Sequence, residues 1–268
     1  MNQKGLSTLK ICEQKLKVQN YSPRTIGMYL QYLNKFLNLQ SKSCSQLNSN
    51  DFQNYIDLYK FTSISQQNQI INAIRFLYKN VLDKKYSKVS FTRPRTEKKL
   101  PQVIDGEYLK SKLNSITNIK HKAILSLTYS TGMRVSEILN LKIRDIDSKR
   151  MIIFIKNAKG RKDRIVPLSS KILELLRDYF IKCRPKEYLF NGQFLPQYTA
   201  ASCNKLVKNY LGKDYHMHLL RHSCFTNLLE NGTDIRIIQK IAGHSNIKTT
   251  EIYTHVSTNL LNRVQLPI

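Results

Sequence analysis

Residues 84–99 read KKYSKVSFTRPRTEKK and separate two parts of the chain that differ in character. The stretch contains Pro94, lacks a helical period of apolar residues and holds seven basic side chains against one acidic one. Such features are typical of an interdomain linker, and a row of lysines and arginines is suited to contact with a phosphate backbone. We therefore predict a basic linker over residues 84–100. The residues expected to bind phosphates are Lys84, Lys85, Lys88, Arg93, Arg95, Lys98 and Lys99.

The chain before this linker, residues 1–83, has the pattern of a small helical domain. Ser22–Pro23 is typical of a helix start, and the apolar residues that follow recur at helical spacing. The pairs at 50–53 and 63–66 indicate two further starts of the capping-box type. With a weaker helix near the N-terminus, about four helices are expected. Their many aromatic residues are expected to form the core of the bundle rather than a base-stacking surface.

The chain after the linker, residues 101–268, has a mixed pattern. A nearly all-apolar helix over 123–129 is expected to end at Gly132, because glycine is common at helix C-termini. Two short strands are predicted over 151–155 and 164–167, with a turn between them. The rest has helical spacing. The predicted fold class is therefore mainly α with a small β-sheet, an α+β fold.

The charge of the chain points to a polyanionic partner. It carries 44 Lys+Arg against 18 Asp+Glu, a formal net charge of +26 with a pI of about 9.9, and the excess is shared by both parts. Nucleic acid is the partner that this charge favours, and a generally basic, solvated surface is the alternative. With 41% apolar residues the chain is too hydrophobic for a disordered basic tail, so both parts are expected to fold around cores.

Several other protein classes are not indicated. The longest purely apolar run is 151–155, far short of the roughly 20 residues that span a bilayer, and the N-terminus lacks the apolar core of a signal peptide. The five cysteines form no C-x-x-C pair, which suggests free thiols in a reducing compartment. Phosphate-binding glycine loops and the H-E-x-x-H zinc motif are absent from the sequence.

The histidines are clustered. Five of the six lie between residues 216 and 255, and the spacing of His218, Arg221 and His222 places them on one helix face. A zinc site is one interpretation, but a cation between the two imidazoles disfavours it, and a third ligand type at useful spacing is lacking. An imidazole beside a guanidinium is better suited to a phosphate.

The order of several short segments is more specific than any single residue. These segments are TGMRVSEIL (131–139), NAKGRKDRIVPL (157–168), HLLRHS (218–223), AGHSN (242–246) and TTEIYTHVS (249–257). Together they resemble the tyrosine recombinase, or phage-integrase, family, and in particular its Xer-type members. The resemblance covers the whole chain. It implies a SAM-like helical core-binding domain over 1–83 and a mixed catalytic domain over 101–268 with a C-terminal exchange tail.

The resemblance also implies a set of catalytic residues and their roles. By position in the matching motifs the set is Arg134, Lys159, His218, Arg221, His244 and Tyr253, with Tyr253 as the nucleophile. Lys156 and Lys162 lie close enough to Lys159 to remain alternatives for the lysine. Glu137 matches an acidic position that orients Arg134.

The implied function is site-specific DNA recombination, in which DNA strands are cut and rejoined through a 3′-phosphotyrosine intermediate for integration, excision or dimer resolution. Two arginines would neutralise the charge that builds up on the phosphate in the transition state. Tyrosine, with an ordinary pKa near 10, needs its proton taken, for which His218 is expected, and Lys159 would protonate the leaving 5′-oxygen. The covalent intermediate keeps the phosphodiester energy, so no ATP, metal or other cofactor is expected.

The expected partners are double-stranded DNA with a specific core site and three further copies of the chain. A tetramer on DNA would form by exchange of the tail that follows Tyr253. The expected location is the cytoplasm, at the nucleoid, without a membrane partner.

Two alternative functions remain. A type IB topoisomerase relaxes supercoiled DNA by similar chemistry, but the exchange-type tail argues against it. A catalytically silent DNA-binding regulator is disfavoured because every expected catalytic residue type is present. The sequence leaves open the target site, the order of strand exchange, and whether a second recombinase or an accessory factor takes part.

Overall fold

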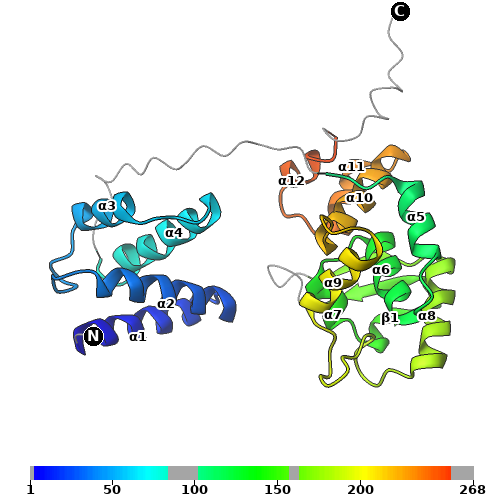
Figure 1. Cartoon of the computed structure of the whole chain (residues 1–268), viewed down its shortest axis with the longest axis horizontal. Helices are drawn as coiled ribbons and strands as arrows, with labels where there is room; N and C mark the ends of the chain where they lie inside the picture. The colour runs from blue at the N-terminus through cyan, green and yellow to red at the C-terminus, as the bar shows by residue number, and fades with distance from the viewer. Residues whose placement is uncertain (1–2, 84–101, 157–162, 255–268) are drawn as a thin grey trace, which may run out of the picture. The chain divides into compact units, whose positions relative to one another are not determined.

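The computed structural model describes residues 3–83, 102–156 and 163–254, and the chain divides into two compact units between Lys98 and Lys99 (Figure 1). The predicted linker over 84–100 lies outside the described residues. Within the described ranges, no helix is both long enough and apolar enough to cross a membrane.

The described part of the N-terminal unit is built from helices. These are α1 (Gln3–Val18), α2 (Pro23–Asn38), α3 (Ser49–Leu58) and α4 (Ile64–Asn80). The side chain of Ser22 accepts a hydrogen bond from the backbone of Thr25 with Pro23 in the first turn, which confirms the predicted start of α2. The predicted cap of α3 is wrong by two residues. Asn48 and Asp51 form the capping box, because Asn50 already lies inside the helix.

Aromatic side chains fill the core of this unit, as predicted. Phe36, Phe52, Tyr55 and Tyr78 are all buried, and the ring centroids of Phe36 and Tyr55 are 5.0 Å apart. Edge-to-face packing of this kind adds to the burial of apolar area. These rings therefore stabilise the bundle and are not available to stack on bases.

The C-terminal unit combines helices with a small sheet. Its helices are α5 (Gly106–Asn114), α6 (Ile119–Thr131), α7 (Val135–Asn140), the 3₁₀ turn η1 (Ile143–Asp145), α8 (Ser170–Cys183), α9 (Ala200–Tyr210), α10 (Met217–Glu230), α11 (Ile235–Ala242) and α12 (Lys248–Glu251). Its strands are β1 (Ile146–Asp147), β2 (Ile152–Ile155) and β3 (Arg164–Pro167), which form an antiparallel sheet in the order β1-β2-β3. The α+β class and the pairing of β2 with β3 are confirmed, whereas β1 was not predicted.

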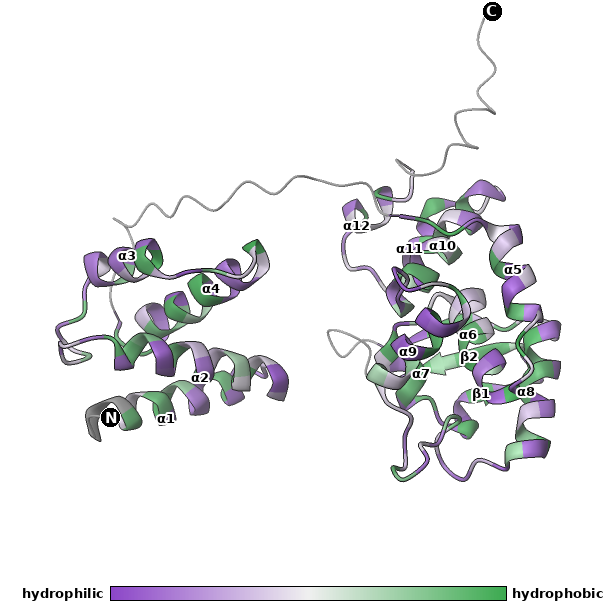
Figure 2. Ribbon diagram, in the orientation of Figure 1, coloured by the Kyte–Doolittle hydropathy of each residue, from purple (hydrophilic) through white to green (hydrophobic). Residues whose placement is uncertain are grey.

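Helix α6 lies at the centre of the C-terminal unit. Seven of its residues, on several faces, are buried, which explains why the sequence there is apolar without a helical period. The other helices carry both hydrophobic and hydrophilic residues along their length (Figure 2). A smaller apolar cluster joins α10 and α11 to the residues after α12, through Phe225, Ile238 and Tyr253. This cluster holds the C-terminal elements of the described chain against α10.

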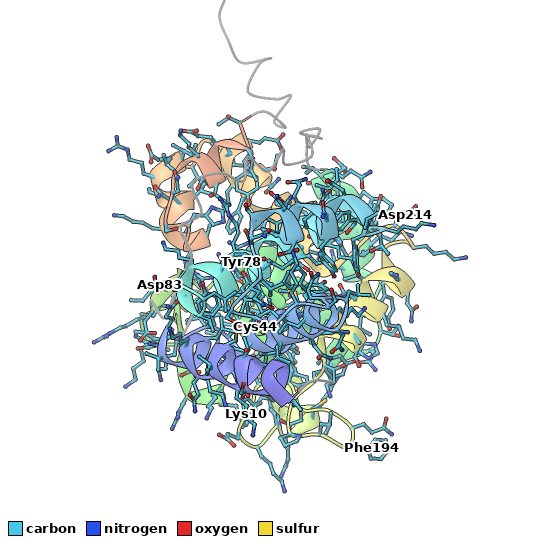
Figure 3. The ribbon with its side chains drawn as sticks, turned by 90° about the vertical axis from the view of Figure 1, so that its left-hand side faces the viewer. Lys10, Cys44, Tyr78, Asp83, Phe194 and Asp214 are labelled. Atoms are coloured by element: carbon cyan, nitrogen blue, oxygen red, sulfur yellow. The ribbon has the colours of Figure 1, made fainter. Side chains whose placement is uncertain are left out.

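Not every apolar side chain is buried. Phe194 lies in the loop between α8 and α9, is 91% exposed, and projects away from the body of the unit (Figure 3). This loop is therefore a surface segment.

Candidate active site

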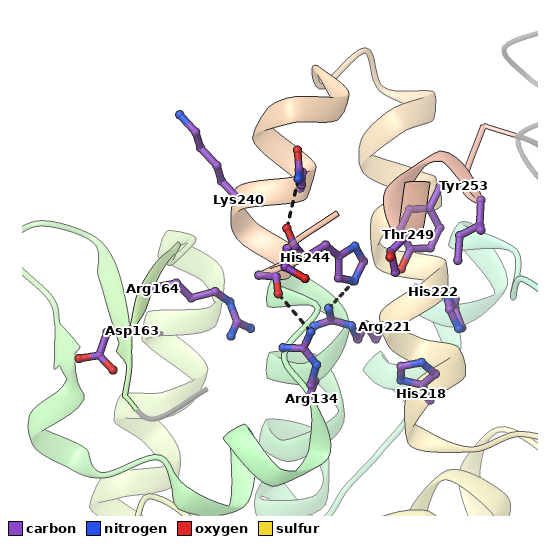
Figure 4. Close-up of a pocket in the computed structure, with 14 residues that line it drawn as sticks. Arg134, Asp163, Arg164, His218, Arg221, His222, Lys240, His244, Thr249 and Tyr253 are labelled. Atoms are coloured by element: carbon purple, nitrogen blue, oxygen red, sulfur yellow. Dashed lines mark hydrogen bonds between the residues drawn. The ribbon is translucent and has the colours of Figure 1, made fainter. Parts of the chain in front are cut away.

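One pocket of the C-terminal unit gathers most of the residues predicted to be catalytic (Figure 4). It has a volume of about 1020 Å³, and Arg134, His218, Arg221, His244 and Tyr253 all line it. The sixth predicted catalytic residue, Lys159, lies outside the described residues, as do the seven basic residues of the predicted linker. The structure thus brings together the five catalytic candidates that it describes.

Arg134 reaches the pocket because of the way α6 ends. Gly132 closes that helix with φ +61°, a left-handed conformation that favours glycine, which confirms the predicted helix end. A Cβ atom at Gly132 would also lie only 2.5 Å from Cζ of Phe225. The chain turns there, and Arg134 becomes the residue before α7.

The remaining candidates come from three other segments. His218 and Arg221 lie on α10, on the face predicted from their spacing. His244 follows Gly243, which ends α11 with φ +63°, and Tyr253 follows α12. Residues far apart in the sequence therefore meet at one point.

Arg221 is the most deeply placed cation of the pocket, with 1% of its surface exposed. It donates hydrogen bonds through Nη1 to the carbonyl oxygen of Gly132 and through Nη2 to that of Ala242, at 2.7 Å for the latter. Its Nη2 also lies 3.1 Å from Nε2 of His244. Burial, together with the charge of Arg134, lowers the pKa of Arg221 to about 10, so it stays charged at neutral pH. Such a fixed cation is prepared for an anion before the anion arrives.

Glu137 lies between two arginines. Its Oε1 accepts from Nη1 of Arg134 at 2.9 Å, and both its oxygens accept from Arg164 at 2.7 Å. The contact predicted between Glu137 and Arg134 is therefore present. Burial would raise the pKa of Glu137, but the hydrogen bonds from Arg164 and Arg134 outweigh burial and hold the pKa at about 2. The carboxylate is ionised at neutral pH.

The contacts of His244 determine which of its ring nitrogens carries the proton. A guanidinium can only donate, so Nε2 of His244, which faces Arg221, must be the acceptor. The proton then lies on Nδ1, which is 3.0 Å from Oγ1 of Thr250 and donates to it. Burial and the charges of Arg221, Arg134 and Arg164 lower the pKa of His244 to about 4. His244 is therefore neutral at pH 7 in the free protein.

Tyr253 is 2% exposed and lies among other rings. Its ring centroid is 5.5 Å from that of Phe225, 5.7 Å from that of His222, and 6.4 Å from that of His244, which is nearly parallel to it. Burial raises the pKa of Tyr253 to about 12, although Arg221 and Arg134 act in the opposite direction. The phenol is therefore protonated at neutral pH, and it can act as a nucleophile only if a base takes that proton.

Two further imidazoles complete this side of the pocket. The rings of His218 and His222 are 4.5 Å apart, and burial, followed by nearby positive charge, lowers the pKa of His218. Burial lowers the pKa of His222 to about 4, and its Nδ1 is buried with no hydrogen-bond partner among the described residues. Both imidazoles are therefore neutral at pH 7, with one ring nitrogen free to accept a hydrogen bond.

Three contributors to the site were not predicted as such. Arg164 and His222 line the pocket, and Thr250 contacts His244. The cluster of histidines was the available signal for His222, which the sequence placed on one helix face with His218 and Arg221 but not in the predicted catalytic set. Within the described part of the chain, no group of three or more His, Cys, Asp or Glu side chains is arranged to hold a metal ion.

Comparison with known proteins gives two matching family models. The model described as phage integrase family matches residues 96–259. The model described as phage integrase, N-terminal SAM-like domain, matches residues 9–88. The two models together match most of both units.

Individual relatives are similar along almost their whole length. The tyrosine recombinase XerA of Pyrococcus horikoshii is 34% identical over 255 residues, which are 92% of this chain and 88% of the relative. The tyrosine recombinase XerD of Staphylococcus haemolyticus is 33% identical over 271 residues, covering 91% of each chain. Among solved structures, XerH site-specific recombinase bound to difH substrate has a TM-score of 0.73 at 24% identity and covers 96% of this chain and 82% of that one, a likeness of fold.

Proposed function

The chain belongs to the phage integrase family of tyrosine recombinases, and from this premise we propose that Tyr253 is the nucleophile with which it cuts DNA. Its activity is site-specific recombination, in which strands are cut and rejoined through a 3′-phosphotyrosine intermediate. The observation that carries the proposal is the position of Tyr253 beside His244, which in turn contacts the buried Arg221.

The first step is attack of the Tyr253 phenol oxygen on the scissile phosphorus. Because the pKa of Tyr253 is about 12, a base has to take its proton, and the neutral imidazole of His218 is suited to that task. The bond from phosphorus to the tyrosine oxygen forms while the bond to the 5′-oxygen breaks. The leaving 5′-oxygen takes a proton from Lys159. Attack by a 5′-hydroxyl of the partner strand then reverses these changes and frees Tyr253.

The arginines stabilise the transition state. The phosphate gains negative charge on its non-bridging oxygens as the nucleophile approaches, and Arg134 and Arg221 supply forked donors for them. Arg221 needs no rearrangement, since backbone carbonyl oxygens already hold its guanidinium. His244 accepts from Arg221 through Nε2 and donates to Thr250 through Nδ1, so it helps to hold Arg221; to hydrogen-bond the phosphate itself it takes up a proton on Nε2, which an approaching anion favours.

Further proposals concern partners and location. We propose that residues 1–83 bind the core site, that the basic linker 84–100 runs along the DNA backbone, and that four protomers assemble by exchange of the tail after Tyr253. The net charge of +26 and the apolar residues of that tail support these proposals. We place the activity in the cytoplasm, at the nucleoid, because double-stranded DNA is the substrate.

The experiment that tests the function is recovery of covalent protein–DNA adducts. The chain is expressed in cells, denatured, and the DNA that stays attached is sequenced to identify the core site. A duplex with this site and a nick next to the scissile phosphate then traps the intermediate. We expect the wild-type chain to form adducts and Tyr253→Phe to bind the same duplex without forming any. Relaxation of plasmids that lack the site would instead favour a topoisomerase.

A further inference from the structure

The carboxylate of Glu137 is saturated by two arginines. Oε1 accepts from Nη1 of Arg134 and from Nη1 of Arg164, and Oε2 accepts from the backbone N–H of Arg134 and from Nη2 of Arg164. A carboxylate has about four acceptor positions, so all of them are used. Two of the four hydrogen bonds to the Glu137 carboxylate therefore come from Arg164, a residue of β3.

Arg164 itself is held from three directions. Its side chain is 8% exposed, against 21% for Arg134, and its Nε donates to the carbonyl oxygen of Ile241 at 2.8 Å. It also packs under the turn at Gly243, where an added Cβ would lie 3.0 Å from the Cδ atom of Arg164. Arg164 is thus a rigid bridge between β3, α7 and the end of α11.

The end of α11 gathers three arginines on three successive carbonyl oxygens. Arg164 donates to Ile241 and Arg221 to Ala242, while Arg134 approaches Gly243 at 3.4 Å. The last carbonyls of a helix lack partners within the helix and carry partial negative charge, which favours cations there. This arrangement fixes the spacing between the arginines.

The formal charges show why Arg164 matters for the phosphate. Arg134 and Glu137 as a pair are neutral, and such a pair attracts an anion weakly. With Arg164 the group of three carries one net positive charge. Arg164 also binds both oxygens of Glu137. The carboxylate therefore cannot bind both terminal nitrogens of Arg134, and one of these nitrogens stays directed at the pocket.

We infer that Arg164 is a positioning residue for the cleavage reaction, which acts through Glu137 to hold Arg134 with free donors directed at the scissile phosphate. This inference rests on the proposed roles of Arg134 and Tyr253. Arg164 does not touch the DNA in this account, because the donors observed on it point to Glu137 and Ile241.

The test compares Arg164→Gln and Arg164→Lys with the wild-type chain. The probe is the nicked duplex carrying the recovered core site, and the readouts are the rate of adduct formation and the dissociation constant for the duplex. Arg164→Gln is expected to slow adduct formation about 10²-fold without a matching loss of DNA affinity, since small displacements of a catalytic group cost this much. Arg164→Lys keeps the positive charge but lacks the two terminal nitrogens that bind both oxygens of Glu137. Its rate of adduct formation is expected to lie between those of the wild type and Arg164→Gln. Arg150→Gln is the matched control, because the side chain of Arg150 is 75% exposed and its Nε lies as far as 3.9 Å from Oδ2 of Asp147.

A second substrate separates positioning from a general loss of structure. A duplex with an uncharged methylphosphonate at the scissile position needs less neutralisation in the transition state. If Arg164 acts through Arg134, the deficit of the Arg164 variants shrinks on this substrate, whereas a distorted fold would slow both substrates equally.

The outcomes are distinguishable. If the wild-type chain forms no adduct, the proposed function fails and this inference fails with it. If the wild-type chain reacts and the Arg164 variants match it, or are slowed equally on both substrates, only the inference is overturned. Should Arg164→Gln fail to fold, Arg164→Lys tests the inference through its rates of adduct formation on the phosphate and methylphosphonate duplexes.

Discussion

Replacing Gly132 by alanine tests how the backbone at the end of α6 builds the pocket. Two costs are expected. A residue with a Cβ loses about 1–2 kcal/mol in a left-handed conformation, and Gly132 has φ +61°. The new methyl would also lie 2.5 and 2.6 Å from Cζ and Cε1 of Phe225, and overpacking of this kind costs about 1–3 kcal/mol. The free energy of unfolding should therefore fall by about 2–5 kcal/mol.

A matched control separates the two costs. Gly232 has φ +84° in the same unit, but a Cβ there would meet nothing within 4 Å. Gly232→Ala should therefore lose only about 1–2 kcal/mol, the backbone cost. Urea unfolding followed by circular dichroism measures both variants.

The two alanine variants should also differ in their rate of adduct formation. Phe225 lies under the guanidinium of Arg221 at 4.8 Å and beside the ring of Tyr253 at 5.5 Å, so a displaced Phe225 moves both. At a temperature where both variants are folded, Gly132→Ala should form adducts much more slowly than the wild type, while Gly232→Ala should not. Equal destabilisation by the two substitutions would refute the argument that Phe225 requires glycine at position 132.

Three further predictions concern Glu137, Thr250 and the tail. The pKa of Glu137 is lowered from 4.5 to about 2, so its contribution to stability is complete above pH 4.5 and is lost as the pH falls toward 2. Urea unfolding should reveal a loss of about 3 kcal/mol over this window in the wild type, and Glu137→Gln should lack that part of the pH dependence. Thr250→Val should cost about 1–3 kcal/mol because the partly buried Nδ1 of His244 loses its acceptor. Thr250→Ser should cost only about 0.8 kcal/mol for the lost methyl, and equal unfolding free energies for the two variants would count against the hydrogen bond between His244 and Thr250. Deletion of residues 258–268 should leave single-site adducts but remove tetrameric complexes from native gels, and undiminished recombination would rule out tail exchange.

Local patterns predicted much of the fold. The end of α6 at Gly132 and the start of α2 at Ser22 follow from the chemistry of one or two residues, and the sequence carries that chemistry directly. Strand β1 could not be predicted in this way. It has two residues, and its strand conformation comes from pairing with β2 rather than from its own composition.

The site residues that stand in recognisable motifs could be predicted from the sequence. Arg221 and Tyr253 could be singled out because they stand in segments that resemble family motifs, but the role of Arg164 could not. Its partners lie 27 and 77 residues away in the sequence, so only the folded chain reveals that it bridges Glu137 and Ile241. The neutral state of His244 likewise depends on burial and on the charges of Arg221, Arg134 and Arg164, which come from other elements of the fold.

The central claim is that Tyr253 forms the bond to DNA, and mass spectrometry of the trapped adduct tests it most directly. After digestion with nuclease and trypsin, the peptide TTEIYTHVSTNLLNR (249–263) contains Tyr253 as its only tyrosine. We predict that this peptide carries the nucleotide phosphate on Tyr253, and that Tyr253→Phe yields no modified peptide. A nucleotide on any other residue of the wild-type chain would contradict the account.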